Sequence, residues 1–249
     1  MSLIAIALLA SLILLARATT PLAVGSGLLA AALGLGVWSA WRRHAPLVRD
    51  DQPDSGTTTA RTGIEALARA IDARDGRPPD HATRMQVYAA GLALAMELPA
   101  AEIEGIRLAA LVRDIGKLAV PVHVLSRVEP LAPDELAAVK IHPVVGAELV
   151  CGLDTAFSLS AVVRGHHERW DGTGYPDGLR GTGIPLGSRI VGLIECYEAL
   201  TTARPYHEAM DAESAQMRLR KEAGHAFDPD LVACFVDALP ALTKELETH

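Results

Sequence analysis

The sequence predicts an all-α protein, on the basis of its composition, the helical spacing of its apolar residues and the lack of any convincing strand pattern. Half of its 249 residues are apolar, with alanine and leucine dominant, whereas only 4% are aromatic. Such residues favour helices over strands. The formal net charge of −7 argues against DNA binding through a basic surface. The three cysteines are far apart, which argues against a disulfide framework and favours a reducing compartment.

The N-terminal residues 1–43 predict two transmembrane helices. Residues 3–16 are apolar or small, and residues 21–41 are apolar and uncharged. As helices they would be about 21 Å and about 31 Å long, against a hydrocarbon core of about 30 Å, and bilayer thinning would accommodate the shorter one. Three arginines follow the second stretch and one lies between the two. The positive-inside rule therefore places everything after residue 42 in the cytoplasm, anchored to the cytoplasmic membrane.

A secretory signal peptide remains the alternative for the first stretch, with Ala16-Arg17-Ala18 as its cleavage site. The basic region that begins such peptides is missing. In both interpretations the second apolar segment remains. Residues 44–60 contain prolines, aspartates, a glycine and three consecutive threonines, a composition typical of a linker. The helical domain is then expected over residues 61–249.

The helices of this domain are predicted from periodic apolar residues and from helix breakers. Apolar residues recur at three- and four-residue spacing over 64–71, and Pro78-Pro79 open a second helix that runs to about Leu98 and ends at Pro99. The glycine-rich stretch 169–187 is expected to be a loop. Further helices are expected at residues 103–116, 134–141, 143–150, 155–166, 190–200 and 231–242.

The most informative stretch is residues 166–176, which read His-His-Glu-Arg-Trp-Asp-Gly-Thr-Gly-Tyr-Pro. Neutral imidazole is a common metal ligand, and glycines beside it let a bulky ligand approach the backbone. A metal lowers the pKa of bound water, and a second metal clamps the other oxygens of an in-line phosphoryl displacement. The pattern therefore predicts a metal site on helices that acts on phosphate. Upstream residues of suitable type are His81, Asp114, Lys117 and His142.

Two motifs carry a resemblance to a known family. Residues 113–117, Arg-Asp-Ile-Gly-Lys, resemble the His-Asp-x-Gly-Lys motif of the HD phosphohydrolase superfamily. Residues 166–176 resemble the His-His-Glu-x-x-Asp-Gly-x-Gly-Tyr-Pro motif of its HD-GYP branch. The resemblance covers about residues 60–240. Further segments match in the same order, namely Asp80-His81, His142-Pro143 with Gly146-Ala147, residues 184–187, residues 197–201 and Arg204-Pro205-Tyr206.

The resemblance implies an HD-domain helical bundle with an HD-GYP extension. Proteins of this branch are bacterial cytoplasmic phosphodiesterases in signal transduction, which use two or three metals, often iron or manganese, to open cyclic di-GMP. By position, the resemblance implies two metal positions that share Asp114. The second position would use His142, His166 and His167. The first would use His81, the histidine of the HD motif and a carboxylate, here Glu195.

The resemblance also implies substrate and catalytic roles. Asp114 and Lys117 would be catalytic, with Lys117 contacting phosphoryl oxygens. An extra acidic ligand of some three-metal members would fall at Arg77, which counts against a third ion. The expected contacts with cyclic di-GMP or a related nucleotide are Lys117, Tyr175, Arg204 and His207.

Arg113 stands where the family has its HD histidine. A guanidinium has no free lone pair and is not deprotonated in proteins, so it cannot be a metal ligand. About 4 Å from a divalent ion, its repulsion would be roughly 8 kcal/mol at an effective dielectric near 20. Arg113 therefore either swings away or replaces the first metal as the counter-charge to Asp114 and Glu195. We expect one or two divalent ions, iron or manganese, with the first position empty or weak.

Two functions remain open from the sequence. The first is a membrane-anchored, metal-dependent phosphodiesterase acting on cyclic di-GMP, with its activity impaired by Arg113. The alternative is a catalytically silent module that binds cyclic di-GMP, or a signalling partner through the Gly-Tyr-Pro loop. A phosphohydrolase for another nucleotide is a third interpretation. Arg113 favours the silent module, whereas the survival of the other motifs favours the enzyme.

Overall fold

The computed structural model describes residues 55–125, 127, 129–153, 157–203 and 208–247, with the backbone alone for residues 55–61. The chain divides into two units after Asp54. The expected membrane hairpin, and the expected linker up to that residue, lie outside the described residues. Among the residues described, no helix is both long and apolar enough to cross a membrane. The hairpin therefore stays a prediction.

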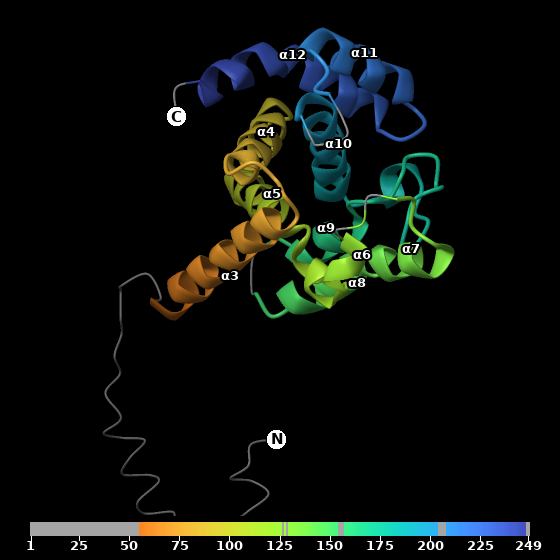
Figure 1. Ribbon diagram of the computed structural model, residues 1–249. Helices are drawn as coiled ribbons and strands as arrows, with labels where there is room; N and C mark the ends of the chain where they lie inside the picture. Colours follow the sequence, from red (N-terminus) through yellow and green to blue (C-terminus); the bar gives the residue numbers. More distant parts are fainter. Residues whose placement is uncertain (1–54, 126, 128, 154–156, 204–207, 248–249) are drawn as a thin grey trace, which may run out of the picture. The chain divides into compact units, whose positions relative to one another are not determined.

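The regular structure of the described residues is helical, which confirms the predicted fold class (Figure 1). Ala223 and Phe227 pair as an isolated bridge rather than as strands. The helices are α3 (Ser55–Arg74), α4 (His81–Ala95), α5 (Ala100–Val112), η1 (Ile115–Ala119), α6 (Val122–Leu125), α7 (Pro133–Lys140), α8 (His142–Val150), α9 (Leu159–Gly165), η2 (Gly181–Gly183), α10 (Leu186–Thr201), α11 (Ala212–Glu222) and α12 (Pro229–Leu246).

Helix α4 ends three residues before its predicted end, for a reason other than the proline. Glu97 adopts a left-handed conformation with φ of 56°. The backbone N–H of Leu98 donates to the carbonyl of Ala93 at 3.1 Å, which closes the helix in a Schellman-type arrangement. Pro99 instead takes the N-cap position of α5.

Other predictions also differ from the structure. Helix α9 begins at Leu159 and not at residue 155, and α10 begins at Leu186, within the predicted loop. Helix α3 begins at Ser55, so residues 55–60 are helical and do not belong to a linker. The predicted helix 103–116 is two elements, because α5 stops at Val112 and the 3-10 helix η1 follows it. Helix α11 was not predicted, because only two of its eleven residues are buried and its apolar stripe is correspondingly narrow.

The hydrophobic core surrounds α4, which packs against α5, α10 and α12. Tyr88, Tyr197 and Phe235 meet edge to face at its centre, with ring centroids 5.1, 5.5 and 6.0 Å apart. Such aromatic contacts bury a large area in a defined geometry. This core fixes the mutual positions of the helices that carry the site residues.

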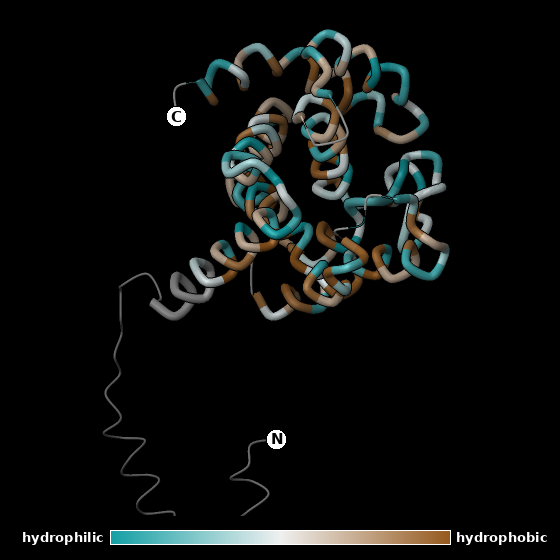
Figure 2. The backbone as a smooth tube through the Cα atoms, viewed as in Figure 1, coloured by the Kyte–Doolittle hydropathy of each residue, from teal (hydrophilic) through white to brown (hydrophobic). Residues whose placement is uncertain are grey.

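A second packed region is built around α8, which packs against both η1 and α9, and it is rich in hydrophobic residues (Figure 2). The contact between η1 and α8 depends on Gly116, since a Cβ there would lie 1.9 Å from the carbonyl oxygen of His142. The close approach brings the Asp114–Lys117 segment beside the first turn of α8. The fold thus gathers the end of α5, the start of α8 and the end of α9 at one place.

Candidate metal and phosphate site

Three histidines from two helix ends form a compact cluster. His142 is the first residue of α8, and His166 and His167 directly follow α9. Their candidate ligand nitrogens all lie within 4.8 Å of one another, and the Nε2 atoms of His142 and His166 are 3.4 Å apart. Two imidazole nitrogens at tetrahedral positions about 2.1 Å from one metal ion would be separated by about 3.4 Å. The spacing therefore suits a shared cation.

Backbone contacts orient two of these rings. The Nδ1 of His142 donates to the carbonyl of Val139 at 2.8 Å, and the Nδ1 of His166 donates to the carbonyl of Val163 at 2.6 Å. A carbonyl only accepts, so the proton is on Nδ1 and the Nε2 lone pair of each ring faces the cluster. Burial lowers the pKa of both rings, that of His166 to about 3. The facing lone pairs of these neutral rings fit a divalent ion.

Asp114 links this cluster to the neighbouring cations. Its Oδ1 lies 3.5 Å from His142 Nε2 and 3.0 Å from Lys117 Nζ, and its Oδ2 lies 3.1 Å from the Arg113 guanidinium. Burial raises the pKa of Asp114, but the positive charges of Arg113 and Lys117 outweigh it and hold the pKa well below its usual range. Asp114 is therefore an anion shared between the histidine cluster and Arg113.

Arg113 is fully buried and does not swing away from the site. One terminal nitrogen lies 2.9 Å from His81 Nε2 and 3.1 Å from Asp114 Oδ2. The other donates to the carbonyl of Ala110 at 2.9 Å, and Nε lies 3.5 Å from Glu195 Oε1. Burial lowers the pKa of Arg113, but the surrounding carboxylates raise it overall. Arg113 thus sits among the residues that the resemblance assigns to the first metal position, and that position does not fit a metal ion.

His81 is held in one tautomer by a carboxylate that sequence reasoning missed. The Nδ1 of His81 lies 3.2 Å from Glu198 Oε2, and Arg84 donates to the same carboxylate. A carboxylate only accepts, so Nδ1 carries the proton and Nε2 accepts from Arg113. The spacing of Glu195 and Glu198 was the available signal, because residues three apart share one face of a helix.

The predicted ligands therefore separate into two groups that share Asp114. One group is the cluster of His142, His166 and His167, with Asp114 beside it. The other surrounds Arg113 and contains His81, Asp114 and Glu195.

Lys117 lies beside Asp114, which precedes it by three residues, but it has a second anionic partner. Its Nζ is 3.0 Å from Asp114 Oδ1 and 3.1 Å from Asp75 Oδ2. Burial lowers the pKa of Lys117, yet the two carboxylates raise it overall. Lys117 is therefore a fixed cation and is poorly suited to give up a proton. Asp75 was not singled out from the sequence, because it belongs to none of the matched motifs.

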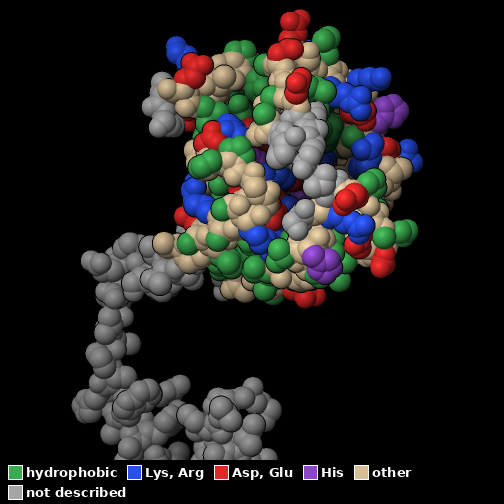
Figure 3. All heavy atoms as spheres, viewed as in Figure 1, with side chains coloured by type: hydrophobic (Ala, Val, Ile, Leu, Met, Phe, Trp, Pro, Cys, Tyr) green, Lys and Arg blue, Asp and Glu red, His purple; other side chains and the backbone are tan. Residues whose placement is uncertain are grey.

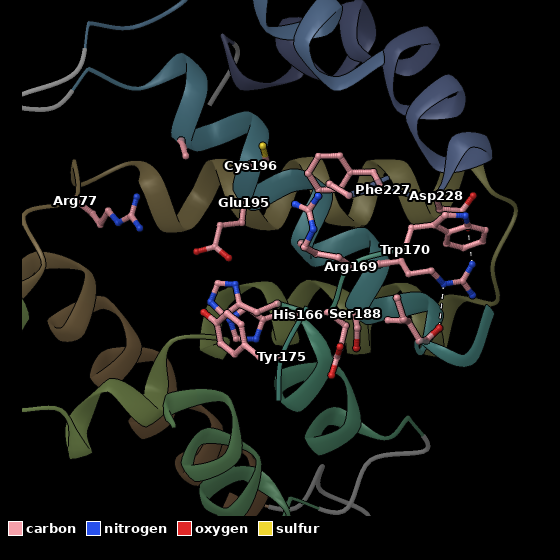
Figure 4. A pocket seen from close by; sticks show the side chains of 17 residues that line it. Arg77, His166, Arg169, Trp170, Tyr175, Ser188, Glu195, Cys196, Phe227 and Asp228 are labelled. Atoms are coloured by element: carbon pink, nitrogen blue, oxygen red, sulfur yellow. Dashed lines mark hydrogen bonds and ion pairs between the residues drawn. The ribbon is translucent and has the colours of Figure 1, made fainter. Parts of the chain in front are cut away.

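A pocket of about 390 Å³ opens beside the histidine cluster (Figure 4). Arg77, Tyr175 and Glu195 lie at one end, and Trp170 and Phe227 lie at the other (Figure 4). The space-filling view shows a hollow on one face of the domain, inside which charged side chains are visible (Figure 3). This pocket brings a concave surface, basic groups and aromatic rings next to the candidate metal ligands.

Tyr175 connects the loop to the cluster. Its ring stacks on His167, with centroids 4.8 Å apart and an interplanar angle of 27°. Burial raises the pKa of Tyr175, and the negative charge of Glu195 raises it further, so the phenol remains a hydrogen-bond donor. The other two predicted substrate contacts, Arg204 and His207, lie outside the described residues.

The loop that carries Tyr175 is anchored by Glu168, a nearly buried carboxylate. Its Oε1 accepts from the backbone N–H groups of Asp177 and Gly178 at 2.7 and 3.1 Å, and its Oε2 accepts from that of Leu179 at 3.0 Å. Charge-assisted bonds of this kind are stronger than bonds between neutral groups. The glutamate of the motif therefore fixes the loop.

Substitution of Glu168 by glutamine is expected to lower the free energy of unfolding by about 1–3 kcal/mol, because an NH₂ group would face a backbone N–H that it cannot bond. Urea denaturation measures the loss, and the amides of Asp177 and Leu179 should exchange faster with solvent. Substitution of the exposed Glu208 by glutamine is the matched control and should change stability by less than about 0.5 kcal/mol. Equal stability of the two variants would contradict the anchoring role.

Comparisons with known proteins point to the same family as the two motifs. The model of the HD domain family matches residues 65–231. The chain is 41% identical over 189 residues to the cyclic di-GMP phosphodiesterase response regulator RpfG of Xanthomonas campestris, covering 75% of this chain and 49% of that protein. It is 32% identical over 194 residues to a cyclic di-GMP phosphodiesterase of Vibrio cholerae, covering 72% and 39%. The chain thus spans about half or less of the length of these curated relatives.

Among solved structures, the fold is similar to a cyclic GMP-AMP specific phosphodiesterase of Vibrio cholerae. The TM-score is 0.54 at 19% sequence identity, over 71% of this chain and 48% of that one. At this identity the likeness supports the fold alone. Together, the sequence and structure matches confirm the resemblance to HD-GYP proteins that residues 113–117 and 166–176 indicated.

Proposed function

Because the chain belongs to the HD domain family, we propose that it is a phosphodiesterase module for cyclic di-GMP or a related cyclic dinucleotide, which uses one divalent ion and has impaired turnover. One observation carries the proposal: the lone pairs of His142 and His166 and the anionic Asp114 face the same point beside His167. The names of the related phosphodiesterases, which are for cyclic di-GMP or for 3'3'-cGAMP, supply the substrate class.

The residues around this point have separable roles in the proposed reaction. An ion bound there, iron or manganese, would supply Lewis-acid activation of water and of the phosphoryl group. Asp114 holds negative charge beside the cluster, and Lys117 provides a permanent cation for a phosphoryl oxygen. Tyr175 offers a hydroxyl donor at the pocket wall. Arg204 and His207 are proposed as further substrate contacts from their positions in the motif.

The impaired turnover follows from the position of Arg113. In-line phosphoryl displacement benefits from two metals that stabilise the attacking and the leaving oxygens. Arg113 fills the position of one of them and is fully buried, so its guanidinium does not reach the substrate. The same observation favours a second candidate function, a silent module that binds the dinucleotide, or a signalling partner through the Gly-Tyr-Pro loop, without hydrolysis.

The membrane location is a separate part of the proposal. The apolar stretches 3–16 and 21–41, with arginines concentrated after the second, support a hairpin that holds the domain on the cytoplasmic side. Fractionation of cells that express the whole chain should recover it with membranes, and it should resist extraction by high salt. Recovery in the salt-washed supernatant would contradict the anchor.

Turnover of cyclic di-GMP by the whole chain in detergent, with Mn²⁺ or anaerobic Fe²⁺, tests the enzymatic function. We expect slow, metal-dependent formation of the linear dinucleotide, which His166→Ala abolishes. The exposed His123 provides the matched control, and His123→Ala should retain the activity. Dinucleotide binding without hydrolysis would support the silent module. A protein that neither binds nor hydrolyses cyclic di-GMP or cyclic GMP-AMP would refute the proposal.

Arg77 is expected to bind a phosphate of the dinucleotide. It lines the pocket and points toward Glu195 (Figure 4), and within the described part of the chain its guanidinium has no side-chain hydrogen bond. A guanidinium can hold two phosphate oxygens at once. Arg77→Met should therefore raise the dinucleotide Kd about tenfold or more in calorimetry, with the metal content unchanged. Arg218→Met, on the surface of α11, should leave the Kd unchanged, and an equal Kd for Arg77→Met would exclude the contact.

A further inference from the structure

The surroundings of Arg113 resemble those of a metal ion, because four groups with lone pairs face its guanidinium. The four partners are an imidazole nitrogen of His81, carboxylate oxygens of Asp114 and Glu195, and the carbonyl oxygen of Ala110. Imidazole, carboxylate and carbonyl groups are also the groups that divalent cations attract. A guanidinium satisfies them as a donor, since all its nitrogens carry N–H groups or positive charge.

These partners come from three different elements, so the guanidinium has the connecting role that a metal would have. His81 begins α4, Glu195 lies on α10, and Asp114 lies between α5 and η1. The acceptor nitrogen of His81 points at Arg113 because Glu198 binds its other ring nitrogen. His81 and Ala110 accept hydrogen bonds from the guanidinium, and the two carboxylates lie beside it as ion-pair partners. The guanidinium thus contacts all four groups without an ion.

Charge and space both oppose a second cation at this position. The side chain of Arg113 is 0% exposed, and it lies between two carboxylates, Asp114 and Glu195, which it neutralises in part. A buried charge pair of this kind is costly to break, because removal of one partner leaves the other as an uncompensated buried charge. A divalent ion placed here would lose these carboxylates to Arg113 and would be repelled by it.

We infer that the Arg113 guanidinium is a built-in replacement for the first metal ion, so that the chain binds one divalent ion and keeps its site assembled without a second. The inference deepens the proposed function and rests on it in one respect, because the histidine cluster is taken as the remaining metal position. It adds that the guanidinium holds the groups of the first position together in the absence of an ion. The wild-type site therefore needs only one bound metal ion to stay assembled.

Metal counting on the whole chain tests the inference. Wild type, Arg113→His and Arg113→Met are stripped with chelator, reconstituted with Mn²⁺, desalted and measured by inductively coupled plasma mass spectrometry. We expect one ion in wild type, two in Arg113→His, which regains an imidazole ligand, and no gain in Arg113→Met. Thermal unfolding is recorded with and without Mn²⁺. Arg113→His should gain about 5–10 °C more from Mn²⁺ than wild type does.

The metal counts test separately the replacement of a metal by Arg113 and the metal site at the histidine cluster. Two ions in wild type, or no additional ion in Arg113→His, would overturn the replacement of a metal by Arg113. An Mn²⁺-dependent rise in Arg113→Met as large as that in Arg113→His would do the same, because methionine supplies no ligand that favours Mn²⁺. No ion in wild type would instead refute the histidine cluster of the proposed function, while a gain of one ion in Arg113→His would still support the replacement. If Arg113→His does not fold after stripping, it is purified with Mn²⁺ throughout and compared with wild type treated alike.

Discussion

Substitution of Gly116 by alanine is expected to lower the free energy of unfolding by more than about 3 kcal/mol and to abolish metal binding. A Cβ at this position would lie 1.9 Å from the carbonyl oxygen of His142 and 2.5 Å from the backbone nitrogen of Gly146. Both are backbone atoms of α8, so no side chain can move aside to make room. To relieve the contact η1 would have to separate from α8, and Asp114 would move away from His142.

Urea denaturation and a metal count after reconstitution measure the two effects. Gly183→Ala is the matched control, because it makes the same chemical change in η2 where a Cβ would meet nothing within 4 Å. The control should retain its metal and change stability by less than about 0.5 kcal/mol. A Gly116→Ala protein that binds metal as wild type does would show that the packing of η1 on α8 does not position Asp114.

The parts of this molecule that were predictable depend on short-range patterns. The helices α4, α5, α10 and α12 carry apolar residues at helical spacing, and the pattern predicts a helix whatever the partner is. The exact ends were harder to predict, as the turn at Glu97 shows, because a non-glycine residue in the left-handed region has no strong sequence signal. Helix α11 escaped prediction for a related reason, since its stability depends on two buried residues and on its cap at Asp211.

The arrangement of the site residues was predictable from the sequence only in part. The loop motif predicted His166 and His167 as members of one cluster, because adjacent residues in one motif are constrained together. Whether Arg113 swings away or stays depends on His81, which is 32 residues distant in the sequence, and on Glu195 from a third helix. The sequence alone left both arrangements open, since the balance between burying a guanidinium and pairing it is set by these tertiary neighbours.

The pairing of Arg113 with Asp114 also determines whether the substitution Asp114→Asn raises or lowers the free energy of unfolding. Asp114→Asn is expected to destabilise the metal-free protein by about 3–5 kcal/mol, because Arg113 and Lys117 would both lose a buried anionic partner. In a site that needs two metal ions, removal of the shared carboxylate would relieve repulsion in the metal-free state and raise stability, as substitutions in strained active sites often do. Here the cation belongs to the chain, so the same substitution removes an attraction.

Urea denaturation in EDTA measures this effect without a contribution from bound metal. Asp237→Asn, which removes an exposed carboxylate from α12, is the matched control and should change the free energy of unfolding by less than about 0.5 kcal/mol. In an Arg113→Met background the penalty for Asp114→Asn should shrink, because part of it arises from the unpaired guanidinium. An increase in stability for Asp114→Asn alone would mean that repulsion between Asp114 and Glu195 outweighs their attraction to Arg113, and that the guanidinium does not balance the site.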